Sequence, residues 1–551
     1  MSTTPTESPV TAPSQSKRQI YIVMSGLMIG MLLAMLDNMV VGTAMPTIVG
    51  ELGGLAHLSW VVTAYTLATA AATPIWGKLG DIYGRKGMFM AAVVLFLIGS
   101  ALAGMAHSMT QLIAFRGVQG LGAGGLMVGA MAIIGDLVPP RERGRYQGLM
   151  AAVMPLAFIG GPLLGGLVTD HLSWRWAFYI NLPLGALALV VTGLTMHLPK
   201  RPRGTSRIDF VGAALLTAGI VCLSLMTSWG GTEYAWSSAT VIGLGIGAAV
   251  LLPLFVLWEL RTDSPILPMS LFRSRNFTLA SVLGFLVGFA MFGAVTFLPQ
   301  FQQLVQGASA TNSGLLLLPL MMGMLVTTMA VGQLVTRTGR YRVFPIVGGV
   351  FMTAGMLLLA QLTVDSTRLT TGLFMLVLGA GLGFLMQNTM LIAQNSVEMK
   401  DMGAASGAAT LFRTIGGSLG VSILGAVYSN QLTGALTDRL GEQAGRSLSG
   451  GGGQLTPALL KQMPANVRDA VEHAVASGVH NVFLWAGAFT LLAIVAAWFI
   501  RETPLRGAPT DQPTPQGPGA LRTRGRLTGD SPGAALTQRT APHAVGQRRT
   551  R

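Results

Sequence analysis

Long apolar stretches recur along the chain between residues 20 and 501, interrupted by short polar segments. A stretch of about 18 or more apolar residues with few charges can cross roughly 30 Å of hydrocarbon as a helix. The pattern therefore predicts an all-α integral membrane protein. We expect fourteen membrane-spanning helices, at residues 20–43, 57–79, 87–105, 110–135, 144–169, 174–196, 209–229, 239–258, 275–303, 311–335, 342–362, 370–396, 403–429 and 481–501.

The predicted spans divide into two six-helix bundles with an additional pair of helices between them. A long outer loop interrupts the second bundle, and it either caps the outer exit or is a tolerated insertion; its flanks could form amphipathic helices. A polar head and a basic tail without apolar periodicity are expected to be disordered. The resulting segments are the head 1–19, the first bundle 20–196, the pair 209–258, the second bundle 275–501 with its outer loop 430–480, and the tail 502–551.

The basic residues predict which side of the membrane each loop occupies. With the amino terminus in the cytoplasm, the short outer loops hold only Arg175 and Arg368, and the basic residues of the other short loops lie inside. This asymmetry follows the positive-inside rule. An even number of spans returns the tail to the cytoplasm, so both termini are predicted to be cytoplasmic.

Composition agrees with a membrane protein and argues against other classes. Half of the residues (51%) are hydrophobic and only 10% are charged, against about 25% charged in soluble domains. The net charge of +15 is therefore interpreted as topology and not as nucleic-acid binding. A single cysteine, Cys222, rules out a disulfide framework and a multi-cysteine metal site. We expect no enzyme activity, no cofactor and no metal ion.

A repeated loop sequence indicates two related halves. Residues 77–86 align with residues 332–341, with Gly, Leu, Gly and Arg shared at a constant offset. Parallel repeats around a site at the middle of the membrane are one way in which secondary transporters are built.

Three ionisable residues lie well inside predicted spans: Asp37, Arg116 and Arg413. A charge at this depth is costly, about 2.5–3.5 kcal/mol on insertion scales, and is a functional candidate for that reason. Asp37 could change protonation if its distance to Arg116 changes between states, whereas arginine cannot release a proton. The alternative is a permanent structural pair, and Arg413 could instead bond backbone carbonyls at a helix interface.

Seven segments carry motifs, in the order 36–46, 77–86, 116–122, 160–166, 174–183, 229–231 and 413–417. In this order the motifs resemble those of the 14-span drug:proton antiporter family of the major facilitator superfamily. The high content of Arg over Lys further suggests GC-rich coding DNA, as in actinobacteria, where such pumps serve antibiotic export and resistance.

The resemblance implies a multi-pass plasma-membrane antiporter that uses the proton motive force for multidrug efflux by alternating access. It links Arg116 to proton movement. It also implies a conformational latch that locks the outward-facing state, and an antiporter motif that makes a tight helix interface. The latch residues are Gly77, Asp81, Gly84, Arg85 and Asp136, and the antiporter motif comprises Gly161, Pro162, Gly165 and Gly166. Thr336 stands at the Asp81 position of the second repeat, so no equivalent latch is expected there.

Polar residues in the second bundle are candidates for a substrate cavity, namely Gln387, Asn388 and Arg413. Span 311–335 has no carboxylate, whereas relatives that export dications carry one there. We therefore expect a small lipophilic, neutral or weakly charged substrate. A secondary carrier for a lipid, siderophore or metabolite is the alternative. Protons and membrane lipids are the other expected partners of a monomer that binds no nucleic acid.

Overall fold

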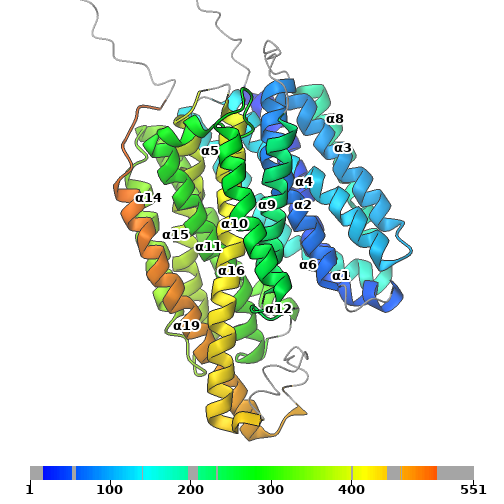
Figure 1. Ribbon diagram of the computed structural model, residues 1–551, viewed down its shortest axis with the longest axis vertical. Coiled ribbons are helices and arrows are strands. Elements are labelled where there is room, and N and C mark those ends of the chain that lie inside the picture. The colour runs from blue at the N-terminus through cyan, green and yellow to red at the C-terminus, as the bar shows by residue number, and fades with distance from the viewer. Residues whose placement is uncertain are drawn as a thin grey trace, which may run out of the picture. The chain divides into compact units, whose positions relative to one another are not determined.

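The computed structural model describes residues 17–52, 58–138, 140–196, 209–230, 234–308, 310–398, 401–443, 460 and 462–505 (Figure 1). The chain divides into two compact units, Met1–Ala508 and Pro509–Arg551. The second unit lies outside the described residues, as do most of the predicted head and all but the first residues of the predicted tail. The described part is all-helical apart from one isolated bridge between Gly230 and Tyr234.

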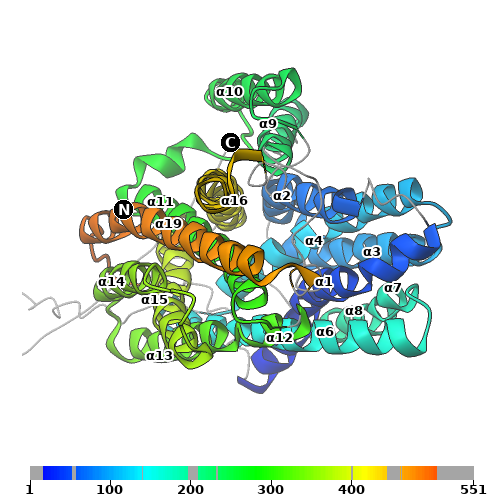
Figure 2. The same ribbon diagram turned by 90° about the horizontal axis from the view of Figure 1, so that it is seen from below.

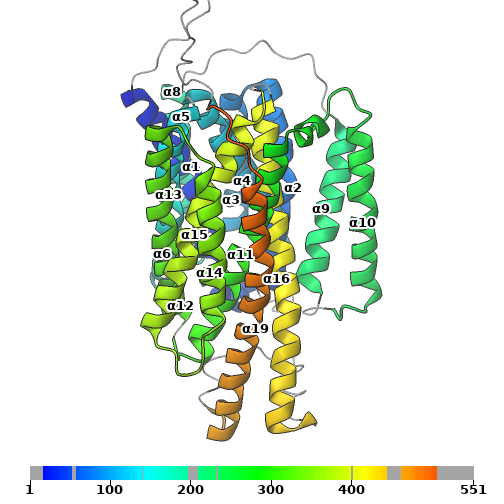
Figure 3. The same cartoon turned by 90° about the vertical axis from the view of Figure 1, so that its left-hand side faces the viewer.

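The first half of the chain forms helices α1 to α8, and an additional pair, α9 and α10, follows. Their bounds are α1 Lys17–Leu52, α2 Leu58–Tyr83, α3 Arg85–Gly104, α4 Met109–Leu137, α5 Pro140–Ala151, α6 Val153–His171, α7 Trp176–Tyr179, α8 Asn181–Thr195, α9 Phe210–Trp229 and α10 Ala239–Glu259. Figures 2 and 3 show α9 and α10 as a hairpin beside the remaining helices, and α9 contacts α2 and α16.

The second half contains the remaining helices of the described chain. Their bounds are η2 Met269–Arg273, α11 Arg275–Leu304, α12 Ala310–Leu315, α13 Leu318–Thr338, α14 Val343–Leu359, α15 Arg368–Asn395, α16 Met402–Leu440 and α19 Ala465–Trp498. Helix α16 continues to Leu440 and α19 begins at Ala465, so both enter the segment predicted as an outer loop. Arg439 and Asp469 join the two extensions at 3.5 Å.

Eleven helices in the described part of the chain are long and apolar enough to cross a membrane, and α14 is a shorter apolar helix. Helix α2, which is not among the eleven, carries threonines at positions 63, 66, 69 and 73. Two predicted spans are interrupted in the structure: 144–169 is divided between α5 and α6, and 311–335 between α12 and α13.

Glycines set the spacing of the helices in the first half. A methyl group on Gly122 of α4 would lie 2.5 Å from the backbone nitrogen of Phe96 on α3, and one on Gly125 would lie 2.5 Å from Cβ of Ala92. A methyl group on Gly120 would overlap the Tyr65 carbonyl oxygen of α2. The glycines at 120, 122 and 125 therefore serve helix packing, because each allows a neighbouring helix to approach closely.

We predict that Gly122→Ala destabilises the protein by about 1–3 kcal/mol, because the added methyl group must push α3 away from α4. Gly117→Ala on the same helix is the matched control, since nothing lies within 4 Å of its Cβ position. That change should be neutral or stabilise by up to about 1 kcal/mol through helix propensity. Unfolding of the purified protein in detergent measures both; equal effects would contradict this packing.

Candidate functional site

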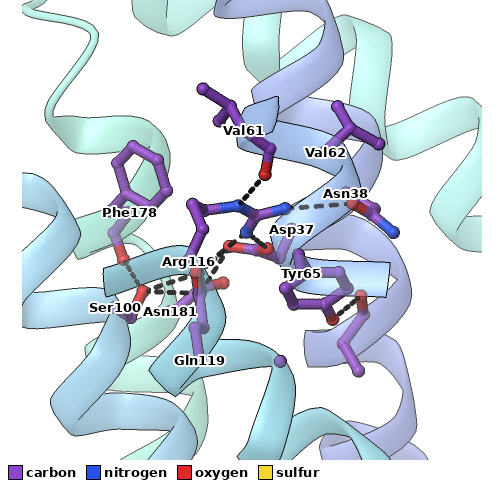
Figure 4. Close-up of polar contacts among 12 residues, drawn as sticks. Asp37, Asn38, Val61, Val62, Tyr65, Ser100, Arg116, Gln119, Phe178 and Asn181 are labelled. Atoms are coloured by element: carbon purple, nitrogen blue, oxygen red, sulfur yellow. Dashed lines mark hydrogen bonds and ion pairs between the residues drawn. The ribbon is translucent and has the colours of Figure 1, made fainter. Parts of the chain in front are cut away.

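A buried ion pair joins the first and fourth helices. Asp37 of α1 and Arg116 of α4 are 1% and 0% exposed, and the Arg116 guanidinium binds the Asp37 carboxylate directly (Figure 4). The structure therefore brings together the two residues that the sequence marks as the proton-coupling pair. Their partners determine what this pair can do.

The carboxylate accepts hydrogen bonds from neutral amides as well as from the arginine. Its Oδ1 atom accepts from Gln119 Nε2 at 2.8 Å and from Asn181 Nδ2 at 2.7 Å. Both amides also donate to Ser100 Oγ, at 3.2 and 2.9 Å. The Asp37 carboxylate is therefore held by α4 and α8 as well as by the arginine.

The guanidinium is also held by neutral groups. It donates to Gln119 Oε1 at 2.8 Å, to Asn38 Oδ1 at 3.0 Å and to the Val61 carbonyl at 3.3 Å. Its carbon lies 4.1 Å from the centre of the Tyr65 ring, as expected for a cation–π contact. Arg116 is thus fixed against α2 by the Val61 carbonyl and the Tyr65 ring.

A cavity of about 510 Å³ lies beside the ion pair. Asn38 and Tyr65 line this cavity and also contact Arg116, so they connect the space to the buried pair. Sequence reasoning missed Tyr65 and Ser100. Asn38, Gln119 and Asn181 do lie in the segments 36–46, 116–122 and 174–183, whose motifs were recognised without a role for these side chains.

The cavity is bordered by both halves of the chain and by α9. Helix α2 contributes Thr63, Thr66, Thr69 and Thr73, and α9 contributes Ser224, Thr227 and Ser228. An adjoining cavity of about 70 Å³ is lined by methionines, namely Met31, Met35, Met127, Met131, Met150, Met154, Met324, Met386 and Met390. Methionine is flexible and polarisable, so these walls suit apolar ligands of varied shape.

Two of the three predicted cavity residues line these spaces. Arg413 lines both cavities and Gln387 lines the smaller one. Asn388 is not among the described residues that line either; it is buried and donates to the Phe384 carbonyl of its own helix at 2.6 Å. Adjacent residues on a helix point about 100° apart, which separates Asn388 from Gln387.

The antiporter motif packs α6 against α1 near Asp37. A methyl group on Gly161 would overlap Met39, and one on Gly165 would overlap the Thr43 hydroxyl. The glycines therefore permit a close approach of the two helices. Pro162 and Gly166 belong to the same helix, α6.

The predicted latch residues also come together. Arg85 binds Asp81 at 2.8 Å and Asp136 at 2.7 Å, and donates to the Ala132 carbonyl at 2.6 Å. Gly84, with φ at +96°, forms the turn that places Arg85, and its counterpart Gly339 has φ at +70°. Both positions need the left-handed region that glycine tolerates.

Asp81 connects this cluster to the second half of the chain. Its carboxylate accepts from the backbone nitrogens of Gly403 at 3.1 Å and Ala404 at 3.0 Å, at the start of α16. Gly77 packs against Gly403, because a methyl group there would lie 2.6 Å from the Gly403 carbonyl oxygen. Asp81 follows the predicted span 57–79; burial raises the pKa of its carboxyl, and Arg85 and the two backbone N–H groups act in the opposite direction.

The contact lies farther along α2 than the cavity, at the end that the positive-inside rule predicts to be cytoplasmic. Along α2, residues 63 to 73 line the cavity, whereas Gly77 and Asp81 contact α16. In the second repeat, Thr336 donates to the Gly332 carbonyl of its own helix and Arg340 is exposed. The repeated glycine turn is therefore common to both halves, and the buried arginine cluster is found in the first.

Comparisons with known proteins agree with this architecture. A model of the Major Facilitator Superfamily matches residues 27–421. The chain is 41% identical over 507 residues to an uncharacterized MFS-type transporter of Mycobacterium tuberculosis, covering 91% of this chain and 72% of that protein. It is 40% identical over 426 residues to the multidrug transporter protein MdtP of Bacillus subtilis, covering 77% and 78%.

The fold is also similar to a solved structure. The crystal structure of the human organic anion transporter MFSD10 matches with a TM-score of 0.58 at 14% identity, covering 88% of this chain and 100% of that chain. At this identity the likeness concerns the fold alone.

We predict that Asp37→Asn and Arg116→Gln each destabilise the protein by about 3–5 kcal/mol, because each leaves a buried charge without its counter-charge. The double variant should lose clearly less than the sum, since it leaves neither charge behind. Chemical unfolding of the four proteins in detergent gives the coupling energy. Additive losses would mean that the pair contributes no mutual stabilisation.

Proposed function

The chain belongs to the Major Facilitator Superfamily, and we propose that it is a proton-coupled multidrug antiporter exporting lipophilic, neutral or weakly charged compounds. Members of this family are multi-pass membrane transporters and not enzymes. The observation that carries the proposal is the buried Asp37–Arg116 pair beside a cavity between the two halves. Relatives named as multidrug transporters support the direction and the class of cargo.

In the proposed cycle, Asp37 is the proton carrier and Arg116 its fixed partner. A proton reaching Asp37 from outside neutralises the carboxylate and weakens its bonds to Arg116, Gln119 and Asn181. Substrate entering the cavity contacts Asn38 and Tyr65, which both touch Arg116. Restoring the full ion pair then expels the proton toward the cytoplasm, so that proton and substrate occupancy alternate.

The proton gradient supplies enough energy for such an exchange. One proton entering per neutral molecule expelled contributes about 2.3 kcal/mol for each 100 mV of membrane potential. At about 1.4 kcal/mol per tenfold, this sustains roughly a fifty-fold substrate gradient.

The proposal includes fourteen spans with both termini in the cytoplasm and the Asp81–Arg85–Asp136 cluster as a latch. Eleven described helices that satisfy the length and apolarity of a span support it, together with α2, α6 and α14, which lie at the three other predicted positions. The contact between Asp81 and the start of α16 supports a latch, because it must break for the cytoplasmic end to open.

We predict that Asp37→Asn reduces proton-driven efflux of the neutral dye Nile red at least tenfold. Asp365→Asn is the matched control, because it makes the same chemical change at an exposed loop residue. Efflux from a pump-deficient strain, with and without a protonophore, measures the effect at equal amounts of protein in the membrane. Uphill efflux by Asp37→Asn at the control rate would refute proton coupling at this site. If neither the wild type nor the control exports the dye, a carrier for a lipid, siderophore or metabolite is favoured.

The single native cysteine permits a direct test of topology and latch. In a Cys222→Ser background, Thr11→Cys and Thr540→Cys should react with an impermeant maleimide only from the cytoplasmic side, and Ser366→Cys only from outside. Labelling of a terminal cysteine from outside would overturn the proposed topology.

In the same background, Thr410→Cys places a thiol on the cavity wall. Asp81→Asn should raise its labelling from the cytoplasmic side several-fold, because the amide cannot accept from both α16 nitrogens. Thr336→Ala, at the equivalent position of the second repeat, is the control. Unchanged labelling with Asp81→Asn would show that Asp81 does not hold this end closed.

A further inference from the structure

Arg413 lies on the face of α16 that borders the main cavity. The residues of this face recur at helical spacing and are Thr410, Arg413, Thr414, Gly417, Ser418 and Val421. Arg413 also lines the smaller methionine-lined cavity, so its side chain is at the junction of the two spaces. The cationic group therefore lies where cargo would pass.

Close packing against α11 fixes the backbone at this position. Gly288 of α11 faces the Arg413 carbonyl so closely that a methyl group there would overlap it. Gly416 similarly meets the Phe285 backbone, and Gly417 meets the Phe292 ring. The segment Arg-Thr-Ile-Gly-Gly thus holds α16 against α11 and keeps Arg413 directed to the cavity side.

Arg413 differs from Arg116 in lacking a counter-charge. Arg116 is paired with Asp37, whereas the side chain of Arg413 forms no hydrogen bond or ion pair with any described residue. It is also the one charged side chain among the described residues that line the two cavities. A charge in a low-dielectric setting is costly unless it is paired. An arginine kept in this position therefore favours an anionic partner that comes from outside the protein.

We propose that Arg413 binds the anionic group of the cargo, and that the transporter prefers lipophilic molecules carrying one carboxylate or similar acid group. This inference rests on the proposed efflux function and narrows its substrate class to weak acids. The acid group pairs with the guanidinium, and the apolar body lies against Met35, Met127, Met154, Met386 and Phe292. A cation of the same shape is repelled.

Three pyrene probes with one apolar body and different charges test this inference on the purified full-length protein at pH 7.5. Wild type should bind pyrenebutyrate at least tenfold more tightly than pyrenebutanol, and pyrenebutyl-trimethylammonium most weakly. This measurement needs no variant. Equal affinities for the acid and the alcohol would overturn the proposal and indicate that Arg413 is a hydrated cavity residue.

Substitutions then locate the preference. Arg413→Gln should remove the tenfold advantage of pyrenebutyrate over pyrenebutanol, and Arg413→Lys should retain most of this advantage. Arg340→Gln, which removes the same charge from an exposed loop, should behave as wild type. A wild-type preference that persists in Arg413→Gln, with unchanged thermal unfolding, would assign the anion to another residue.

Nile red efflux separates this inference from the function on which it rests. Wild type should expel the neutral dye, and Asp37→Asn should not. Loss of the anion preference in Arg413→Gln, together with loss of efflux in Asp37→Asn, supports both proposals. Anion preference that survives in Arg413→Gln, alongside efflux that fails in Asp37→Asn, refutes the inference alone. Efflux that persists in Asp37→Asn, alongside anion preference that is lost in Arg413→Gln, refutes the proposed proton coupling alone.

Discussion

The arrangement depends on one charged contact that the membrane makes costly. Asp37 and Arg116 are fully enclosed, and each satisfies the other with the help of Gln119 and Asn181. A buried pair of this kind is weak evidence for stability, since two apolar residues can pack as well. In the proposed cycle the pair is present because Asp37 changes its charge when it loads and releases a proton.

Helix α2 connects this pair to the rest of the transporter. Its first turns contact Arg116 through the Val61 carbonyl and the Tyr65 ring, its middle lines the cavity, and its last turns hold the start of α16 through Asp81. A shift of α2 therefore affects the ion pair, the cavity and the contact with α16 together. In the proposed cycle this shared helix is the physical link between protonation and the change of access.

The sequence predicted the ion pair because few ionisable residues occur at membrane depth, so that the partners were almost determined. It also predicted that Asp81, Arg85 and Asp136 would cluster, through the resemblance of their motifs. It did not predict Gly403 as a partner, since nothing local relates residues far apart in the chain. It placed both Gln387 and Asn388 at the cavity, whereas the rotation of α15 brings only Gln387 among the described lining residues. The extension of α16 past the predicted span depends on its contact with α19. Both are decided by tertiary packing.

The central claim is that cargo and proton compete through Asp37, and proton release on cargo binding tests it most directly. Nile red added to purified protein in weakly buffered detergent solution, at a pH low enough to load Asp37 with a proton, should release about one proton per transporter. A pH-sensitive dye detects the release, and Asp37→Asn should release none. Equal proton release by the two proteins, with equal dye binding, would contradict the account.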